Sequence, residues 1–287
     1  MEVIIKTITS ASEIQNLSRR LKSSRKIIGF VPTMGFLHEG HLSLIKESKK
    51  KCDVTFVSIF VNPTQFAPSE DLSEYPRNLQ RDKNLLEEKN VDYLFLPDET
   101  EIYVRNFQTY VNVEHITRRL EGEKRPAHFR GVTTVVTILL NCVMPDYAFF
   151  GQKDAQQAAV IIQMVKDLKQ PTEIVVSPIV REKDGLAMSS RNYYLSKSER
   201  QDALVLNKAL RLGEEKIKSV ELRANFILSE MVELVNTVAS ARLDYINIVD
   251  AENFEKQDSL VAGHEYYLLI ACYIGKTRLI DNVKIKV

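Results

Sequence analysis

The stretch IIGFVPTMGFLHEGH at residues 27–41 decides the fold of the N-terminal part of this chain. Its apolar residues 27–31 predict a buried strand, and Pro32–Gly35 after them predict a glycine-bearing turn. Leu42 and Leu44 then continue the apolar pattern at helical spacing. A strand, a turn and a helix in this order are typical of one unit of a parallel α/β sheet.

Two histidines, His38 and His41, lie in the first turn of this expected helix. Spaced i, i+3, they share a face with the free backbone N–H groups and the positive end of the helix dipole. Such a place suits an anion, and Gly40, which has no Cβ, would let a nucleotide approach closely. The turn is therefore a candidate phosphate site. The alternative is structural, since histidines at helix starts also serve as plain caps.

Composition limits the class of protein. The chain has 287 residues, enough for two domains, and its 39 Lys and Arg against 38 Asp and Glu give a net charge of +1. This balance argues against nucleic acid or an anionic membrane as the main partner. No apolar run approaches the ~20 residues of a membrane span, and the N-terminus lacks a signal-peptide layout, so we expect a cytoplasmic protein. Cys52, Cys142 and Cys272 lie among apolar residues and are expected to be reduced, without a role.

Up to residue 180, short β-branched runs alternate with amphipathic stretches. We expect strands at Val3–Ile5, Ile27–Val31, Val54–Val61, Tyr93–Leu96, Tyr147–Phe150 and Glu173–Val176, with helices near 11–22, 40–51, 76–89, 131–143 and 154–168. The alternation predicts a doubly wound parallel, Rossmann-like sheet of the α/β class over residues 1–180. In such sheets ligands bind beyond the carboxyl ends of the strands.

Residues 181–287 predict a second, smaller α+β domain, expected to act as a lid. Ser196 and Glu199 form a capping-box pattern that opens a charged helix, and a second helix covers roughly 221–240. Strands are expected at Tyr245–Val249, Tyr266–Tyr273 and Arg278–Ile285, in a small antiparallel sheet.

Polar turns after two further strands are expected at the same sheet edge as the histidines. Gly151-Gln152-Lys153-Asp154 opens a helix, so Lys153 can place a cation near phosphates, with Gln157 one turn further on the same face. Asn62 and Gln65 can aim amides at a small ligand from the loop after the strand at 54–61. The alternatives are a solvated lysine, surface glutamines and ordinary Asn-Pro turn chemistry.

A fourth segment, Met188-Ser189-Ser190-Arg191, lies in the polar stretch between the two expected domains. Two hydroxyls and a guanidinium are suited to gripping phosphate oxygens, although Ser-Arg pairs are also common in loops.

In this order along the whole chain, the motifs resemble the pantothenate synthetase family. They are Pro32–Gly35 with His38–His41, Val61–Phe66, Tyr75-Pro76-Arg77, His128–Val132, Gly151–Gln157 and Met188–Asn192. That family is similar to class I aminoacyl-tRNA synthetases and nucleotidyltransferases, which share the H-x-G-H turn. Ala127 stands where many members have glycine before His-Phe-Arg.

The resemblance implies an ATP-dependent, AMP-forming ligase of pantothenate biosynthesis that joins pantoate to β-alanine through an enzyme-bound pantoyl adenylate. His41, His38 and Lys153 would be catalytic. The nucleotide site would comprise Met34, Gly35, Phe36, Leu37, His38, Glu39, Gly40, His41, Gly151, Gln152, Lys153, Asp154, Val180, Met188, Ser189, Ser190 and Arg191. Gln65 and Gln157, with Asn62, would bind the small substrates, and the family implies a homodimer.

Physical chemistry fits this reaction, because charge on the phosphoryl oxygens needs fixed cations and N–H groups rather than a covalent nucleophile. Mg²⁺ is expected to bind the phosphates of ATP and water rather than a protein cage, so no protein ligand is named. Two alternatives stay open: a nucleotidyltransferase that moves AMP onto a phosphate, and a non-catalytic nucleotide-sensing module. A tRNA-charging fragment is disfavoured by the neutral charge and by the lack of an anticodon-binding region.

Overall fold

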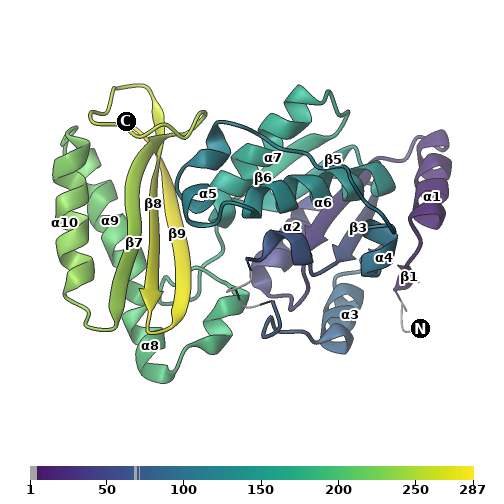
Figure 1. Cartoon of the computed structure of the whole chain (residues 1–287), viewed down its shortest axis with the longest axis horizontal. Coiled ribbons are helices and arrows are strands. Elements are labelled where there is room, and N and C mark those ends of the chain that lie inside the picture. Colours follow the sequence, from purple (N-terminus) through teal and green to yellow (C-terminus); the bar gives the residue numbers. More distant parts are fainter. Residues whose placement is uncertain (1–4, 68–69, 71) are drawn as a thin grey trace. The chain divides into compact units, whose positions relative to one another are not determined.

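A computed structural model of the chain describes residues 5–67, 70 and 72–287 (Figure 1). Internal contacts divide it into two compact units. The first unit comprises the chain up to Gly151 together with Gln157–Pro178, and the second comprises Gln152–Gln156 together with Ile179–Val287. The short segment Gln152–Gln156 thus groups with the C-terminal part of the chain.

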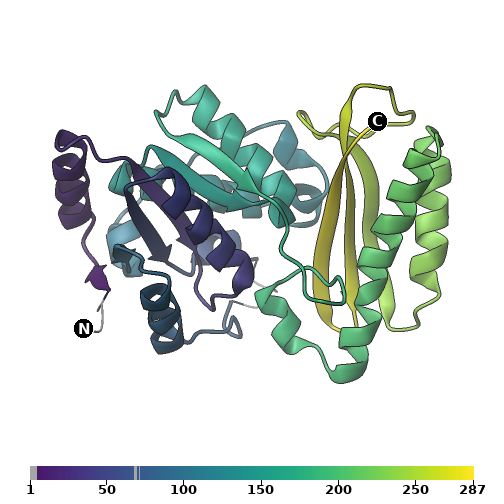
Figure 2. The ribbon, with the colours of Figure 1, turned by 180° about the vertical axis from the view of Figure 1, so that it is seen from behind.

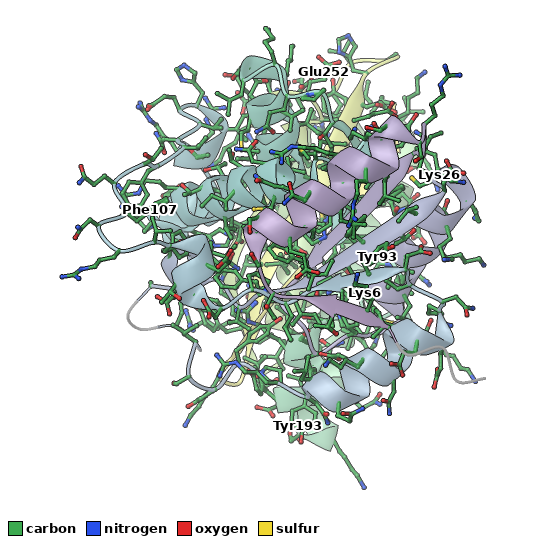
Figure 3. The ribbon with its side chains drawn as sticks, turned by 90° about the vertical axis from the view of Figure 1, so that its right-hand side faces the viewer. Lys6, Lys26, Tyr93, Phe107, Tyr193 and Glu252 are labelled. Atoms are coloured by element: carbon green, nitrogen blue, oxygen red, sulfur yellow. The ribbon has the colours of Figure 1, made fainter. Side chains whose placement is uncertain are left out.

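The described first unit contains a six-stranded parallel sheet with the spatial order β1-β4-β3-β2-β5-β6. Its strands are β1 (Lys6–Ile8), β2 (Ile28–Thr33), β3 (Val54–Ile59), β4 (Tyr93–Phe95), β5 (Tyr147–Gly151) and β6 (Glu173–Ser177). Lys6 of β1 pairs with Tyr93 of β4, and Figure 3 shows these two residues on neighbouring strands. The first strand lies later in the chain than the expected Val3–Ile5, of which Val3 and Ile4 are outside the described residues.

Helices cover both faces of this sheet. They are α1 (Ala11–Ser23), α2 (Glu39–Lys51), α3 (Leu79–Glu88), α4 (Glu99–Ile102), α5 (Glu121–Lys124), α6 (His128–Val143) and α7 (Ala155–Asp167). On one face α2 packs against β2, β3 and β5, and it lies in front of the strands in Figure 2. On the other, α6 packs against α1 and β2, and Thr137 of α6 contacts Met164 of α7. Both faces being buried explains why the central strands are almost wholly apolar.

The order of the strands creates a topological switch point at β2. The chain runs from β2 outward through β3 to β4, and then returns to build β5 and β6 on the other side of β2. Loops after β2 and β5 therefore leave the sheet in opposite directions, and the space between them is where such sheets bind ligands. The segment that follows β2 contains both histidines.

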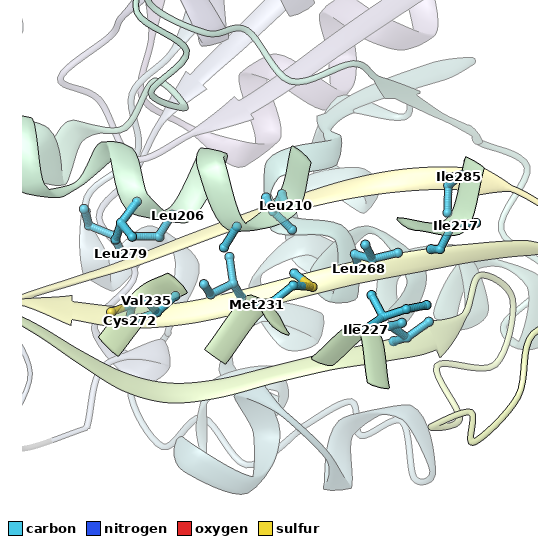
Figure 4. Packing of buried hydrophobic residues seen from close by; sticks show 14 of the residues in the cluster. Leu206, Leu210, Ile217, Ile227, Met231, Val235, Leu268, Cys272, Leu279 and Ile285 are labelled. Atoms are coloured by element: carbon cyan, nitrogen blue, oxygen red, sulfur yellow. The ribbon is translucent and has the colours of Figure 1, made fainter. Parts of the chain in front are cut away.

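The second unit is an antiparallel sheet of β7 (Ala241–Asp250), β8 (Glu265–Ile274) and β9 (Thr277–Lys286), covered by helices. The helices are α8 (Lys197–Asp202), α9 (Leu204–Lys218) and α10 (Ala224–Asn236). Figure 4 shows the core between α9, α10 and the sheet, which includes Leu206, Leu210, Ile217, Ile227, Met231, Val235, Leu268, Cys272, Leu279 and Ile285. Gly213 of α9 lets the layers approach, since a Cβ there would lie 2.6 Å from Met231 Sδ and 2.7 Å from Leu268 Cδ2.

The α/β class, the parallel sheet and the small antiparallel sheet agree with the sequence predictions. The capping box at Ser196 and Glu199 is present, but the helix that it opens is interrupted at Ala203. Helices α4 and α5 were not predicted, and α3 begins at Leu79 rather than near residue 76. Cys142 and Cys272 are free and buried, whereas Cys52 is only half-buried. Among the described residues no helix is long and apolar enough to span a membrane.

Candidate active site

The histidine turn, residues 34–41, is held in part by its own imidazoles. His38 is the N-cap residue of α2, and its Nδ1 accepts a hydrogen bond of 3.1 Å from the backbone N–H of Gly40. His41 Nδ1 accepts one of 3.3 Å from the backbone N–H of His38, and the ring centroids lie 4.1 Å apart. Because Nδ1 is the acceptor on both rings, the proton of each neutral imidazole lies on Nε2. Both rings are thus caps, and their Nε2–H groups have the donor character that a phosphate oxygen requires.

A buried carboxylate holds the other half of this turn. Gly35 and Phe36 adopt left-handed φ angles of 82° and 47°, a strain that costs about 1–3 kcal/mol for a residue such as phenylalanine. Asp82 of α3 accepts the backbone N–H of Phe36 at 2.7 Å and that of Leu37 at 2.8 Å. Burial raises the pKa of Asp82, and the two N–H donors oppose this by stabilising the carboxylate. Asp82, which was not predicted from the sequence, keeps the turn in its strained shape.

The geometry of this turn limits the part that two residues of the predicted nucleotide site can play. Leu37 was predicted to line the ATP site, but its side chain is fully buried in the hydrophobic cluster beneath α2. Gly40 was expected to leave room for a ligand, but a Cβ there would lie 2.8 Å from Cε1 of His38. The missing side chain therefore makes room for the His38 ring.

Asn62 shapes the loop after β3 from inside the protein. It is 1% exposed, its Oδ1 accepts the hydroxyl of Tyr103 at 2.6 Å, and its Nδ2 donates to Gly131 O at 3.2 Å and Gln65 Oε1 at 3.1 Å. Both polar atoms of this buried amide are engaged by Tyr103, Gly131 and Gln65, so the structure does not support Asn62 as a direct substrate contact. Gln65, whose amide also contacts Met34 Sδ, is only half-buried and stays a candidate.

A neutral histidine fixes the backbone of the same loop. His128 Nδ1 donates to the carbonyl oxygen of Gln65 at 3.0 Å, and its Nε2 accepts from Arg125 at 3.2 Å. Burial, and secondly the charge of Arg125, lower the pKa of His128 to about 4. Arg125 is in turn held by both carboxylate oxygens of Glu70, at 2.6 and 2.8 Å. Residues 128–132 were part of the motif set in the sequence, but the motif did not show that His128 donates a hydrogen bond to the backbone of Gln65.

The lysine segment, Gln152–Asp154, is a 3₁₀ turn that precedes α7. Lys153 and Gln157 were expected on one helical face, which is wrong because the helix begins only at Ala155. By its contacts Lys153 groups with the second unit and Gln157 with the first. Within the second unit, Asn282 of β9 donates from Nδ2 to the carbonyl oxygens of Gln152 and Lys153, each at 2.9 Å.

The serine loop, Met188–Arg191, follows a short hairpin in the second unit. The backbone N–H of Met188 donates to Val180 O at 3.0 Å, and Ser189 Oγ accepts the N–H of Arg191 at 3.2 Å, which caps the 3₁₀ turn Ser190–Tyr194. Ser189 and Lys153 line the same small cavity of about 10 Å³, together with Asp281 of β9. The second unit therefore carries the lysine segment and the serine loop together.

The described residues do not form a metal cage. Among them, no group of three or more His, Cys, Asp or Glu side chains is arranged to hold a metal ion. A metal ion at this site would therefore depend on ligands from the substrates and water as well as from the described residues.

The chain is similar to known proteins along nearly its whole length. The sequence profile described as pantoate-beta-alanine ligase matches residues 6–284. The chain is 49% identical to a pantothenate synthetase of Pseudothermotoga lettingae, over 98% of each chain, and 50% identical to one of Acetivibrio thermocellus, over 99% of this chain and 100% of the other.

Two solved structures share the fold. Pantothenate synthetase from Thermus thermophilus has a TM-score of 0.91 and 41% identity, over 99% of this chain and 100% of that chain. Pantoate-beta-alanine ligase from Francisella tularensis, solved in complex with beta-gamma ATP and beta-alanine, has a TM-score of 0.80 and 36% identity, over 97% of each chain. The chain belongs to the pantoate–β-alanine ligase family.

Proposed function

We infer that this chain is a ligase that condenses pantoate with β-alanine in an ATP-dependent reaction and releases AMP and pyrophosphate. The observation that carries this proposal is the histidine turn at the switch point of the sheet, where His38 and His41 cap α2 through Nδ1. Family membership supports these substrates, and the Francisella relative was solved in complex with beta-gamma ATP and beta-alanine.

The first step joins pantoate to AMP. A carboxylate oxygen of pantoate attacks the α-phosphorus of ATP, the bond from that phosphorus to the bridging oxygen breaks, and pyrophosphate leaves. Negative charge grows on the phosphoryl oxygens, so positioned donors and cations lower the barrier. We assign this role to the Nε2–H groups of His38 and His41, to Lys153 and to Arg191.

The second step forms the amide. The amine of β-alanine attacks the carbonyl carbon of the pantoyl adenylate, loses a proton, and displaces AMP with one of the original carboxylate oxygens. Since no covalent enzyme intermediate is needed, the protein acts mainly by orientation. We propose that Gln65 and Gln157 orient the two small substrates, and that Asn62 and His128 position Gln65.

We further propose that the remaining candidates contact ATP: Met34, Gly35, Phe36, Glu39, Gly40, Gly151, Gln152, Asp154, Val180, Met188, Ser189 and Ser190. For Leu37 only the backbone is a candidate, because its side chain is buried. We propose Mg²⁺ as an ion that enters on the phosphate oxygens of ATP, residues 1–180 and 181–287 as the domains, a homodimer, and the cytoplasm as the location.

Isotope transfer tests the proposal. Pantoate labelled with ¹⁸O in its carboxylate should transfer one label to AMP when ATP and β-alanine are present. Without β-alanine, pyrophosphate should appear in a burst equal to the enzyme sites and then nearly stop, because the adenylate is held from water. ADP and phosphate as products would instead identify an acyl-phosphate ligase. Unlabelled AMP would identify a different acceptor for the adenylyl group.

A further inference from the structure

Two adjacent polar residues on an edge strand of the second unit are buried. In the order β7-β8-β9, β9 is an edge strand and pairs with β8 on one side only. On this strand, the residue Asp281 is 3% exposed and Asn282 is 1% exposed. Burial of a carboxylate and an amide is unfavourable unless each is fully hydrogen-bonded. The hydrogen-bond partners of these two side chains therefore show which segments of the chain are fixed against β9.

Asn282 holds the lysine segment. Its Nδ2 donates to the carbonyl oxygens of Gln152 and Lys153 at 2.9 Å, and its Oδ1 accepts from Gln152 Nε2 at 3.2 Å. The two bonds from Nδ2 fix the backbone at both residues that precede Asp154, and the third holds the side chain of Gln152. A lysine side chain is long and flexible, so a fixed backbone limits the volume that its ammonium group can reach.

Asp281 holds the start of the hairpin that leads to the serine loop. Both of its oxygens accept from Arg181, at 2.6 and 3.0 Å, and Arg181 also donates to the carbonyl oxygens of Gly185 and Asn282, at 3.1 and 3.2 Å. Arg181 forms a β-bridge with Ala187, the residue before Met188. A bidentate guanidinium–carboxylate pair fixes orientation as well as distance.

Successive residues of a strand point to opposite faces, so neighbours on β9 can serve two different segments. We propose that Asp281 and Asn282 are positioning residues of the ligase reaction: Asn282 sets the place of Lys153, and Asp281, through Arg181, sets the place of the serine loop. This assignment of Asp281 and Asn282 rests on the proposed function, because that function gives Lys153 and Ser189–Arg191 their role. It makes β9 the common support of both phosphate-binding segments.

A double-mutant cycle tests the role of Asn282. Asn282→Asp keeps the shape of the side chain but replaces the two N–H donors by an oxygen that repels the carbonyl oxygens. We expect kcat for pantoate-dependent pyrophosphate formation to fall about 10- to 30-fold, as for the loss of two hydrogen bonds. In the Lys153→Ala background the same change should have less than a twofold further effect, because its action passes through Lys153. A full 10-fold loss in that background would overturn the assignment.

A matched control separates positioning from general destabilisation. Val235→Ala removes buried apolar contacts of α10 in the same core, and Val235 is not one of the residues that line the cavity of Lys153 and Ser189. It should lower the melting temperature at least as much as Asn282→Asp does, while kcat stays within twofold of the parent. An equal loss of kcat in Val235→Ala would mean that the Asn282 effect reports stability alone, and the proposal would fail.

Hydrogen exchange of the ligand-free protein gives a readout that does not depend on activity. Asn282→Asp should speed exchange at amides 152–156 and leave 182–192 unchanged, whereas Asp281→Asn should do the reverse. If Asp281→Asn does not fold, Arg181→Lys serves instead, because a lysine cannot bridge both oxygens. Uniformly faster exchange across β7–β9 in both variants would overturn the proposal. Should the wild-type chain make no AMP, the proposed function fails while this exchange pattern still decides the structural part.

Discussion

The histidine turn and the lysine segment each follow a central strand of the parallel sheet, β2 and β5, but they are held in opposite ways. In the histidine turn the caps come from residues two and three positions away, with Asp82 as a support 46 positions further along the chain. Lys153 is held by Asn282, 129 positions away. The first segment is built mainly from its own sequence, and the second depends on a strand of its own unit that lies far away in the sequence. Substitutions near residues 34–41 should therefore disturb the histidine turn. The lysine segment should be disturbed by substitutions that are far from it in the sequence.

The largest effects should come from the functional side chains themselves. Lys153→Ala and His41→Ala are each expected to lower kcat about 10²- to 10³-fold, because we propose that both groups act on charge that grows in the transition state. His41→Asn is the matched variant, since asparagine can still accept the His38 N–H as a cap. It should restore the melting temperature but not kcat. Activities within a few-fold of the parent for both alanine variants, measured by pyrophosphate release, would contradict the assigned phosphate site.

Gln65, in the loop after β3, combines both kinds of support. Its side-chain amide accepts from the nearby Asn62, and its backbone carbonyl oxygen accepts from His128, which is distant in the sequence. Gln65→Ala should raise KM for pantoate and β-alanine about 100-fold, because a site built to pair with substrate oxygens loses a specific partner. Affinity for a non-hydrolysable ATP analogue, measured by calorimetry, should change less than threefold. The exposed Gln80 of α3 provides the control, and Gln80→Ala should change neither. Equal losses for ATP and pantoate would indicate a misfolded loop.

Asp82→Asn weakens the remote support of the histidine turn. Loss of a charged acceptor for the N–H groups of Phe36 and Leu37 should cost about 2 kcal/mol, as for hydrogen bonds to charged groups. We expect kcat to fall about 10-fold with KM for pantoate nearly unchanged. Asp167→Asn, at the exposed end of α7, should have no effect. A variant with normal kcat would show that the capping histidines hold the turn without Asp82.

The pH dependence of stability tests His128 as a buried neutral group. Its pKa is lowered from 6.5 to about 4, so between these values the unfolded chain binds the proton and the folded chain does not. Stability from this group is therefore complete above pH 6.5 and falls on acidification, by about 2 kcal/mol at pH 5. His128→Gln, which can donate to Gln65 O and accept from Arg125, should lack this fall in urea unfolding. His115→Gln is the exposed control, and identical pH profiles for all three proteins would reject the assignment.

The smallest effects should come from two glycines, Gly40 in the first turn of α2 and Gly151 at the end of β5. Gly40→Ala places a Cβ 2.8 Å from the His38 ring and should lower kcat about 5-fold, with a change in stability of about 1 kcal/mol or less. Around Gly151, apart from its chain neighbours, no atom of the described residues lies within 4 Å of an added Cβ. Gly151→Ala should leave the stability of the protein unchanged. If this variant loses activity, the loss should come only from weaker ATP binding. A lower melting temperature for Gly151→Ala would contradict this contrast.

These contrasts explain how far the sequence could predict the molecule. The strands, the capping box of Ser196 and Glu199 and the histidine turn were predictable, because periodicity and capping act over a few residues. The burial of the Leu37 side chain could not be predicted, because a motif gives a position along the chain but not the direction of a side chain. Asp82 and Asn282 were missed because their partners lie far away in sequence, and isolated Asp and Asn residues resemble ordinary surface positions.

The arrangement at β9 also has a consequence for the behaviour of the protein in concentrated solution. An unpaired edge strand exposes N–H and C=O groups to which a strand of another molecule can add, and this is a common start of aggregation. At Asn282 the backbone N–H already donates to Asp281 Oδ1 at 2.7 Å, and the carbonyl oxygen accepts from Arg181 at 3.2 Å. The side chains that hold the lysine segment and the hairpin before the serine loop thus also occupy part of this edge. Variants of Asp281 or Arg181 should therefore aggregate sooner than variants of equal stability elsewhere in the second unit.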